Sequence, residues 1–310
     1  MKVAIVGAGP AGMSCANALL SFGLEPVVIE RADHVGGIQR ANFHPNLWML
    51  GMPGETGIEI TARLAKHYFE LPIATHLKAD IQAVVRTDAG FMLRLTEADG
   101  ERELAVAAMV LATGSRPRAT PELAALARKS DRVIVGPLSE TIRDDIRASR
   151  VLILGGGDNA LDHALFLAER GNRVTVCARR EYSARRQFQT ACAGRPEVEL
   201  RRSCTPSSVS ATPEGISVVL DGGSETYDWL LAMYGYDPNT RLLERLEPGI
   251  RPRLTDSGHI HVERGQRTSV PGLYAAGDVT DCVQPSVPTA IAQGLAAAKA
   301  IEQDLARLPA

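Results

Sequence analysis

The sequence predicts an α/β protein built from two similar units, each centred on a parallel sheet. The clearest observation is an apolar strand that leads through a glycine-rich turn into a helix at residues 3–22, and the same arrangement returns at residues 151–170. The composition agrees, because 45% hydrophobic and 23% charged residues over 310 positions describe an ordinary globular chain that is long enough for two cores.

The first turn has the spacing of a nucleotide-binding turn. Gly7, Gly9 and Gly12 form a G-x-G-x-x-G pattern. The first glycine permits the tight turn, the second lets the backbone approach a pyrophosphate, and the third lets helix and strand pack closely. The next strand, at residues 26–29, ends at Glu30, whose carboxylate suits ribose hydroxyls. These residues predict a bound dinucleotide; the alternative is an ordinary tight turn between a strand and a helix.

A long irregular segment at residues 39–57 follows the glycine pair Gly36-Gly37. Its glycine and proline density indicates a loop, and a loop of this length inside a domain is usually functional. Beyond it we expect a helix at residues 58–69 and strands at 77–86, 91–96 and 103–111, the last of which runs into the turn Ala112-Thr113-Gly114.

The second glycine-rich turn contains Gly155, Gly157 and Ala160 in a G-x-G-x-x-A pattern. It follows a predicted strand at residues 151–154 and leads into a predicted helix at residues 160–170. Two such fingerprints in one chain, each between a strand and a helix, are far more specific than one.

The two units differ at the end of their second strands. The strand at residues 173–177 ends in Ala178-Arg179-Arg180, with Arg185 soon after, where the first unit has Glu30. Guanidinium groups bind a 2′-phosphate that an acidic residue would repel, so the second site is predicted to prefer NADP(H) to NAD(H). The alternative is a solvated basic face, since residues 173–202 carry eight arginines against three glutamates.

The remaining segments connect or complete these units. Residues 115–150, rich in proline and charge, and the turn-rich residues 234–240 are expected to be crossings between domains. Strands are expected at 216–220 and 229–233, followed by an apolar strand that ends at Gly277-Asp278 and a last helix at 288–305. Asp278 is either a turn cap or a carboxylate held for a ligand hydroxyl.

Charge, hydropathy and cysteine spacing exclude several functions. The net charge of −2 does not favour nucleic acid or membrane partners, and no apolar run is long enough for a membrane span. A strand that begins at Val3 leaves no room for a signal peptide, so we expect a cytoplasmic protein. The five cysteines, Cys15, Cys177, Cys192, Cys204 and Cys282, include no C-x-x-C pair, which argues against a disulfide framework, a zinc site and a redox-active dithiol.

Taken together, these motifs resemble the low-molecular-weight thioredoxin reductase superfamily of FAD-dependent pyridine nucleotide oxidoreductases, over almost the whole chain. The resemblance implies two Rossmann-like three-layer domains, with an NAD(P)H-binding domain at residues 115–244 inserted into an FAD-binding domain at residues 1–114 and 245–310. It also implies a homodimer, which no pattern in the residues shows.

The resemblance assigns cofactor-binding roles to residues that match the motifs of the superfamily. FAD would be held by Gly7, Gly9, Pro10, Ala11, Gly12, Glu30, Arg31, Gly37, Gln39, Asn46, Ala112, Thr113, Gly114, Gly277, Asp278, Ser286, Val287 and Thr289. NADPH would be held by Gly155, Gly157, Asp158, Asn159, Ala160, Arg179, Arg180 and Arg185.

The sequence departs from thioredoxin reductases at the catalytic dithiol. Their C-A-T-C motif precedes the second fingerprint, where residues 135–141 here read V-G-P-L-S-E-T. Without adjacent thiols the chain cannot attack a substrate disulfide in the usual way. Cys282, close to the predicted flavin motif, either forms a mixed disulfide or flavin adduct or is a packed small hydrophobe, which we favour. Near the flavin, Pro285-Ser286-Val287 replaces R-Q-A, and Ala178 replaces a histidine.

We therefore expect an oxidoreductase that passes a hydride from NADPH to FAD and electrons on to a small redox protein such as ferredoxin or flavodoxin. Ferredoxin-NADP reductases of the superfamily also lack the dithiol, although they usually add a C-terminal extension where this sequence stops after its last predicted helix. The alternatives are direct action on a quinone, a ferric chelate, free flavin or oxygen, or a slow redox sensor. No catalytic acid or base is assigned; His163 is more consistent with a surface or packed residue.

Overall fold

The computed structural model describes residues 1–282 and 284–307 and divides into two compact units. Unit 1 comprises Met1–Ser115 and the chain from Pro238 onward, and unit 2 comprises Arg116–Asp237. The second boundary therefore lies before the expected division at 244/245. The reason is a set of hydrogen bonds in unit 1, where the Thr113 hydroxyl donates to the Asn239 carbonyl oxygen at 2.7 Å and the Asn239 side-chain amide donates back to the Thr113 carbonyl oxygen at 3.2 Å.

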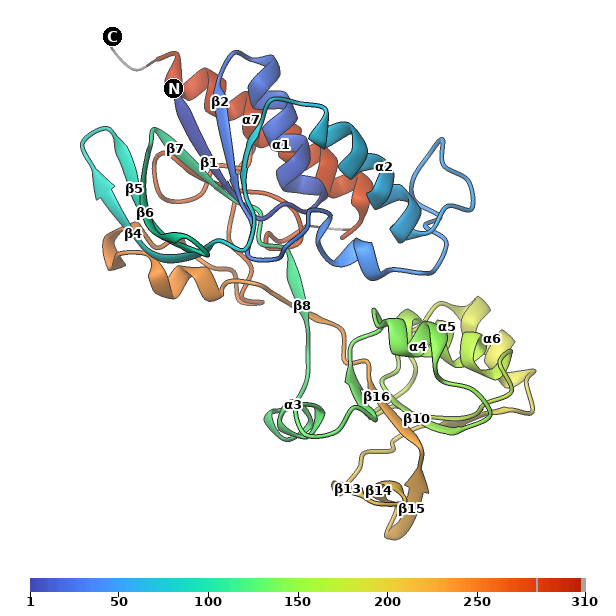
Figure 1. Cartoon of the computed structure of the whole chain (residues 1–310). Coiled ribbons are helices and arrows are strands. Elements are labelled where there is room, and N and C mark those ends of the chain that lie inside the picture. Colours follow the sequence, from blue (N-terminus) through green and yellow to red (C-terminus); the bar gives the residue numbers. More distant parts are fainter. Residues whose placement is uncertain (283, 308–310) are drawn as a thin grey trace. The chain divides into compact units, whose positions relative to one another are not determined.

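Unit 1 combines a parallel sheet, an antiparallel sheet and helices (Figure 1). Its elements are β1 (Lys2–Val6), α1 (Pro10–Ser21), β2 (Glu25–Ile29), the 3-10 helix η1 (Gly37–Ala41), α2 (Gly57–Phe69), β3 (Ala74–His76), β4 (Asp80–Thr87), β5 (Gly90–Glu97), β6 (Gly100–Val106), β7 (Ala108–Leu111), the 3-10 helices η2 (Arg241–Arg245) and η3 (Pro248–Ile250), β18 (Leu273–Ala275) and α7 (Val287–Leu305).

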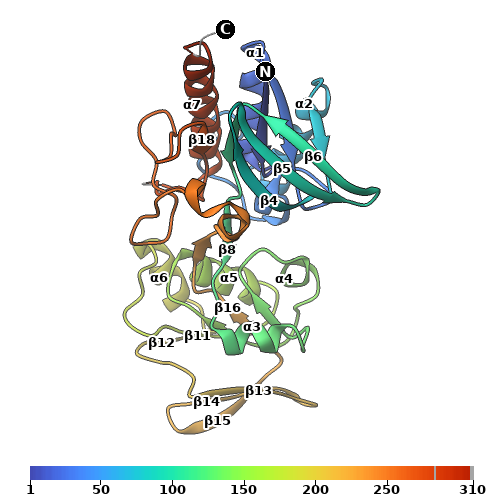
Figure 2. The same ribbon diagram turned by 90° about the vertical axis from the view of Figure 1, so that its left-hand side faces the viewer.

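The parallel sheet of unit 1 has the strand order β18-β7-β1-β2-β3. Alternate residues of its central strand enter two different cores, because successive side chains of a strand point to opposite faces. Val3 and Ile5 pack with α1 and α7, whereas Ala4 and Val6 pack with the antiparallel sheet β4-β5-β6. These are the three predicted layers, and Figure 2 shows β4, β5 and β6 together.

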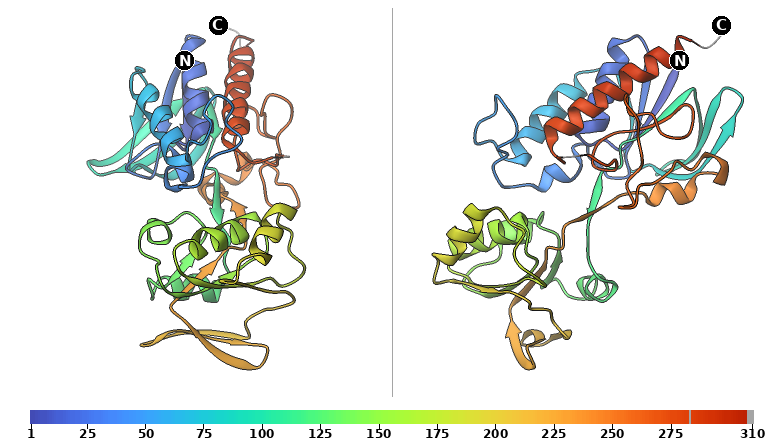
Figure 3. Two further views of the ribbon diagram at one scale, coloured as in Figure 1. Left: turned by 90° about the vertical axis from the view of Figure 1, so that its right-hand side faces the viewer. Right: turned by 180° about the vertical axis from the view of Figure 1, so that it is seen from behind.

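Helices α1 and α7 lie side by side in unit 1 (Figure 3). Gly294 of α7 permits this approach, because a Cβ atom added there would lie 2.2 Å from the Ala11 carbonyl oxygen and 2.9 Å from the Cys15 backbone nitrogen. The alanine-rich sequence of α7 thus places the helix close against the one that starts at the first glycine-rich turn.

Unit 2 repeats this plan with its own elements. They are α3 (Pro121–Ala127), β9 (Val133–Val135), α4 (Glu140–Asp144), β10 (Arg150–Leu154), α5 (Asp158–Ala168), β11 (Arg173–Cys177), α6 (Arg186–Ala193), β12 (Val198–Arg201), β13 (Ser208–Thr212), β14 (Gly215–Leu220), β15 (Gly223–Tyr227) and β16 (Trp229–Ala232). Strands β8 (Ser115–Pro117) and β17 (Tyr236–Pro238), on the two segments that cross between the units, pair with each other.

The parallel sheet of unit 2 has the order β12-β11-β10-β16-β9. One of its faces packs on the antiparallel sheet β13-β14-β15 and on α3. Leu152 and Leu154 of β10 enter this core, and α5 packs against β10 and β11 from the sheet's other face. The predicted α/β fold with two three-layer units is therefore confirmed.

Three sequence expectations about elements were wrong. The predicted strand at 103–111 is two strands, because β6 belongs to the antiparallel sheet and β7 to the parallel one. Residues 115–150 are more than a crossing, since they supply α3, α4 and the edge strand β9. The predicted strand at 77–86 begins only at Asp80, and the edge strand β3 precedes it.

Candidate functional site

The first glycine-rich turn is packed too tightly for any side chain at two of its glycines. Gly7 has φ +106°, and a Cβ added there would lie 2.3 Å from the Ala112 carbonyl oxygen. A Cβ on Gly12 would lie 1.9 Å from the Gly7 carbonyl oxygen. The turn from β1 into α1 is thus fixed against the residue that follows β7 and against the first turn of α1 itself.

Helix α1 begins without a side-chain cap. Its N-cap is Gly9, with Pro10 at the first position, and no side chain in the described part of the chain caps it. Helices α2, α3 and α7 differ, because Thr56, Thr120 and Ser286 cap them through side-chain oxygens. Uncapped N–H groups at the positive end of a helix form an anion site.

Glu30 is held at the carboxyl end of β2, next to this helix start. One carboxylate oxygen accepts from the Ala8 amide and the other from the Ala32 amide, each at 2.8 Å. Because each carboxylate oxygen has a second lone pair, both can still accept a hydrogen bond from a ligand hydroxyl. The two backbone bonds fix the orientation in which the carboxylate does so.

A cavity of about 290 Å³ lies beside Glu30. Predicted residues Gly7, Glu30, Arg31 and Thr113 line it, together with others that the sequence reasoning missed. The missed lining residues include Ala79, Asp80 and Ile81 after β3 and Asn239, Arg241, Leu242, Glu244 and Arg245 from the return segment. Of these return residues only Asn239 lies in the turn-rich run at 234–240, and that run indicates a crossing and not a site.

Other predicted residues gather around the start of α1. A Cβ on Gly37 would lie 3.2 Å from the Gly9 Cα atom, and a Cβ on Gly277 would lie 3.0 Å from the Ala11 Cβ atom. The structure therefore brings the Gly36-Gly37 pair, the turn after β7 and the turn after β18 to one helix N-terminus.

Asp278, which follows Gly277, is largely buried. Burial raises the pKa of its carboxyl above the usual 3.8, against the opposing effects of a hydrogen bond from the Ser115 hydroxyl, at 3.4 Å, and of the charge of His259. Gln293 of α7, which the sequence reasoning missed, accepts a hydrogen bond from the Gly277 amide at 2.8 Å and so fixes this turn.

Several predicted residues are engaged within their own segments. The Asn46 side chain accepts from the Trp48 amide at 3.0 Å, and the Gln39 side chain accepts from the Asn42 amide group at 3.0 Å. The Ser286 hydroxyl accepts from the Thr289 amide and caps α7, whose first residue is Val287.

The second glycine-rich turn is packed like the first at its first glycine. Gly155 has φ +155°, and its added Cβ would lie 2.3 Å from the Met233 carbonyl oxygen, the residue after β16. Helix α5 begins at Asp158 with Gly157 as N-cap and no side-chain cap, and Ala160 is fully buried. A cavity of about 360 Å³ lies here, lined by Gly155, Gly156, Gly157, Asp158, Asn159, Arg179, Ser183, Met233, Tyr234 and Gly235.

The predicted arginines occupy three different environments. Arg179 lines the cavity, and Arg180 is exposed beside it in the sequence. Arg185 is bound to Asp158, whose carboxylate accepts from its Nε atom and from its backbone amide, each at 2.7 Å. The Gly156 carbonyl oxygen accepts from the Ser183 and Ala184 amides at 2.9 and 3.0 Å. These bonds hold residues 178–185 between β11 and α6, which we call the arginine loop, against the glycine-rich turn.

The basic face at residues 173–202 is partly neutralised. Within this described segment, four of its eight arginines form ion pairs with carboxylates: Arg185 with Asp158, Arg195 with Glu169, Arg201 with Glu199 and Glu225, and Arg202 with Glu181.

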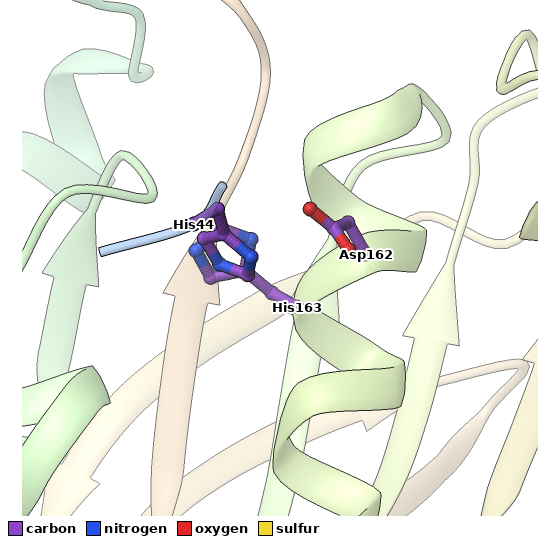
Figure 4. Close-up of side chains that lie close together, drawn as sticks. All are labelled: His44, Asp162 and His163. Carbon is purple, nitrogen blue, oxygen red and sulfur yellow. The ribbon is translucent and has the colours of Figure 1, made fainter. Parts of the chain in front are cut away.

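His163 lies inside α5 next to Asp162 (Figure 4) and is buried, with 2% of its surface exposed. Its Nδ1 atom lies 2.8 Å from the Asn159 carbonyl oxygen and its Nε2 atom 2.9 Å from the Pro137 carbonyl oxygen. Both contacts belong to the packing of unit 2, so of the two roles considered for this residue, a surface residue or a packed one, the structure shows the packed one.

The expectation that no cysteine has an adjacent thiol was wrong. Cys15, Cys177, Cys192 and Cys204 are buried and Cys282 is partly exposed, but Cys177 and Cys204 are not isolated. Their Sγ atoms lie 2.7 Å apart, although 27 positions separate them in the sequence. The parallel pairing of β11 with β12 brings them together, which spacing in the sequence could not indicate.

A protein-family model described as "Pyridine nucleotide-disulphide oxidoreductase" matches residues 1–294. The chain belongs to this family. The family depends on FAD and NAD(P)H, and it includes the thioredoxin-reductase-like proteins that the sequence resembles.

Relatives in this family cover nearly the whole chain. A ferredoxin-NADP reductase of Limosilactobacillus fermentum is 28% identical over 292 residues, which are 89% of this chain and 84% of the relative. A thioredoxin reductase of Coxiella burnetii is 28% identical over 326 aligned positions, covering 97% and 95% of the two chains. The fold is similar to the crystal structure of T. acidophilum thioredoxin reductase, with a TM-score of 0.84, 22% identity and 98% of each chain covered.

No helix among the described residues combines the length and the apolar character that a membrane span requires.

Proposed function

We propose that this family member is a flavoprotein that prefers NADPH to NADH and passes electrons from FAD to a small redox protein such as ferredoxin or flavodoxin. One contrast carries the proposal: of two matching turns with uncapped helix N-termini, one is beside the carboxylate of Glu30 and the other is beside the guanidinium of Arg179. A carboxylate suits free ribose hydroxyls, whereas a guanidinium suits a 2′-phosphate.

The residues of unit 1 fit FAD. The α1 amides would bind the pyrophosphate, Glu30 would accept from ribose hydroxyls, and Asp278 would accept from hydroxyls of the flavin side chain. Bound FAD supplies the chemistry of hydride acceptance and electron transfer. The remaining predicted flavin contacts, from Gln39 and Asn46 to Ser286, Val287 and Thr289, stay part of this proposal.

The residues of unit 2 fit NADPH. The α5 amides at Asp158, Asn159 and Ala160 would bind its pyrophosphate, and Arg179, with Arg180 next to it, would bind the 2′-phosphate. We propose a different role for Arg185, whose guanidinium already binds Asp158: it holds the arginine loop against the glycine-rich turn.

Asp278→Asn is expected to weaken FAD binding without destabilising the FAD-free protein. Burial raises the folded-state pKa of this carboxyl above 3.8. The carboxyl therefore adds to the free energy of unfolding below about pH 3.8, where it is protonated, and this stabilisation is lost as the pH rises through the raised pKa. At neutral pH the asparagine variant, which buries no charge, should therefore unfold at the same temperature as wild type or higher. FAD titration and thermal unfolding of FAD-free protein measure the two effects; a lower unfolding temperature for the variant would contradict this account.

The absence of an accessible dithiol supports an external acceptor over disulfide reduction. A substrate disulfide must be attacked by a thiolate. In this chain four cysteines are buried, Cys282 is partly exposed, and residues 135–141 contain no cysteine. Burial raises the pKa of Cys15 to about 12 and that of Cys192 to about 11, which keeps these thiols protonated at neutral pH.

A ferredoxin or flavodoxin is the acceptor that we favour. The relative from L. fermentum carries the name ferredoxin-NADP reductase, and this chain shares 28% of the aligned residues with it. We further propose that the protein is a cytoplasmic homodimer, by analogy with the superfamily.

Anaerobic stopped-flow mixing with NADPH tests the proposal. Rapid bleaching of the flavin absorbance is expected, and slow bleaching would instead favour a redox sensor. The reduced protein is then mixed with ferredoxin or flavodoxin, and in separate experiments with a quinone, a ferric chelate, free flavin or oxygen. Fastest re-oxidation by the redox protein supports the proposal, whereas fastest re-oxidation by a small molecule would replace it with direct small-molecule reduction.

A further inference from the structure

Two buried thiols meet at the carboxyl edge of the unit 2 sheet. Cys177 is the last residue of β11, and Cys204 lies in the loop after β12; both strands are labelled in Figure 2. Their Sγ atoms lie 2.7 Å apart, and each residue is 2% exposed. The pair packs in the core between the parallel sheet and β13-β14-β15. Neither thiol has a role in the proposed electron transfer.

We propose that Cys177 and Cys204 form an intramolecular disulfide when the protein meets a hydroperoxide. A disulfide has an S–S distance of about 2.05 Å, so the sulfurs need to approach by less than an ångström. The backbone already holds the two residues in register, because the Cys204 amide donates to the Ala178 carbonyl oxygen at 2.9 Å and the Ala178 amide donates to the Arg201 carbonyl oxygen at 2.9 Å.

Of the two thiols of this pair, Cys204 is the one that an oxidant reaches first. Its neighbours Ser203 and Thr205 are both exposed, whereas Cys177 ends a buried strand. Ser203 has φ +52°, a left-handed conformation that is unfavourable for a residue with a side chain. A small opening of this strained surface loop exposes Cys204 while the strands of the sheet stay paired.

The oxidation balances with one peroxide. The Cys204 sulfur displaces water from hydrogen peroxide and becomes a sulfenic acid; the Cys177 sulfur then attacks it, loses its proton, and a second water leaves. Two thiols and one peroxide give one disulfide and two waters. Burial raises the pKa of the Cys177 thiol, together with its contact with Cys204, so we expect the second step to be slow and the reduced pair to persist without oxidant.

The disulfide would cross-link the part of unit 2 that carries the arginine loop. It would join the end of β11, two residues before Arg179, to the loop after β12 and close a segment of 27 positions. A cross-link of this size restricts the unfolded chain and typically raises an unfolding temperature by several degrees. This inference does not depend on which nucleotide or acceptor the protein uses.

Peptide mapping after peroxide treatment tests whether Cys177 and Cys204 form the disulfide. The purified protein is incubated with hydrogen peroxide, alkylated in denaturant and digested with trypsin without reductant. The expected product is residues 174–179 joined to residues 203–241, at a mass two hydrogens below the sum of the peptides and separable by dithiothreitol. Cys177 and Cys204 should both be lost from the alkylated peptides, and the unfolding temperature should rise by several degrees and return on reduction.

Matched variants distinguish oxidation of this cysteine pair from oxidation of the other cysteines. Cys204→Ser should abolish the linked peptide and the rise in unfolding temperature, whereas Cys192→Ser, at another buried thiol, should retain both. The proposal is overturned if wild type keeps Cys177 and Cys204 as thiols at a peroxide concentration that oxidises Cys282. It is equally overturned if Cys204 accumulates as sulfinic acid while Cys177 stays reduced.

Discussion

Replacing Gly7 by alanine is expected to destabilise unit 1 by about 3 kcal/mol and to abolish FAD binding. Two costs add up: roughly 1–2 kcal/mol for a side chain at positive φ, and roughly 1–3 kcal/mol for overlap in a packed interior. The overlap is with the Ala112 carbonyl oxygen, 2.3 Å from the added Cβ, so relief requires movement of backbone and not of a flexible side chain. Denaturant unfolding and the ratio of flavin to protein absorbance measure the two effects.

Gly23→Ala is the matched control for this substitution. Gly23 also has positive φ, at +77°, but an added Cβ there would have no atom of the described residues within 4 Å. It should cost only the conformational term, about 1 kcal/mol, and leave FAD binding intact. Equal losses of stability in the two variants, with FAD retained in both, would show that close packing at the first turn does not organise this site.

The parallel sheets and their turns could be predicted from the sequence because their signals are local. A buried strand, a glycine-rich turn and a helix follow one another within about 20 residues, and each constrains the next through backbone geometry. The same locality explains why Gly7 and Gly155 have closely similar surroundings in the two units. It also explains why the Cys-free region at 135–141 could be recognised from its position before the second turn.

The parts that could not be predicted depend on contacts between distant segments. Arg241 and Arg245 line the unit 1 cavity only because the returning chain packs beside β4. Cys177 meets Cys204 only through the register of β11 and β12, and Gln293 reaches Gly277 only through the packing of α7. The charge pattern was misleading for a similar reason. Four of the eight arginines at residues 173–202 form ion pairs with carboxylates, and the sequence alone does not show these pairs.

Arg179→Ala is expected to lower kcat/KM for NADPH by roughly 10- to 100-fold and to leave that for NADH within about threefold. A charge-assisted hydrogen bond contributes roughly 1.5–3 kcal/mol, and only NADPH carries the 2′-phosphate that would receive it. Steady-state rates with both nucleotides and an artificial electron acceptor give the ratio. Arg173→Ala is the matched control, because it removes the same charge from the opposite end of β11 and should change neither value.

Arg185→Ala should behave differently from Arg179→Ala, although both side chains belong to the same loop. The Arg185 guanidinium binds the Asp158 carboxylate at 2.7 Å, at the first residue of α5, where the pyrophosphate of either nucleotide would lie. Loss of this ion pair loosens the loop and leaves Asp158 unneutralised beside that pyrophosphate, so kcat/KM should fall for NADPH and NADH by similar factors. Asp158→Asn in the same background should restore part of the activity with both nucleotides, because it removes the unpaired charge. A loss confined to NADPH would instead assign Arg185 to the 2′-phosphate.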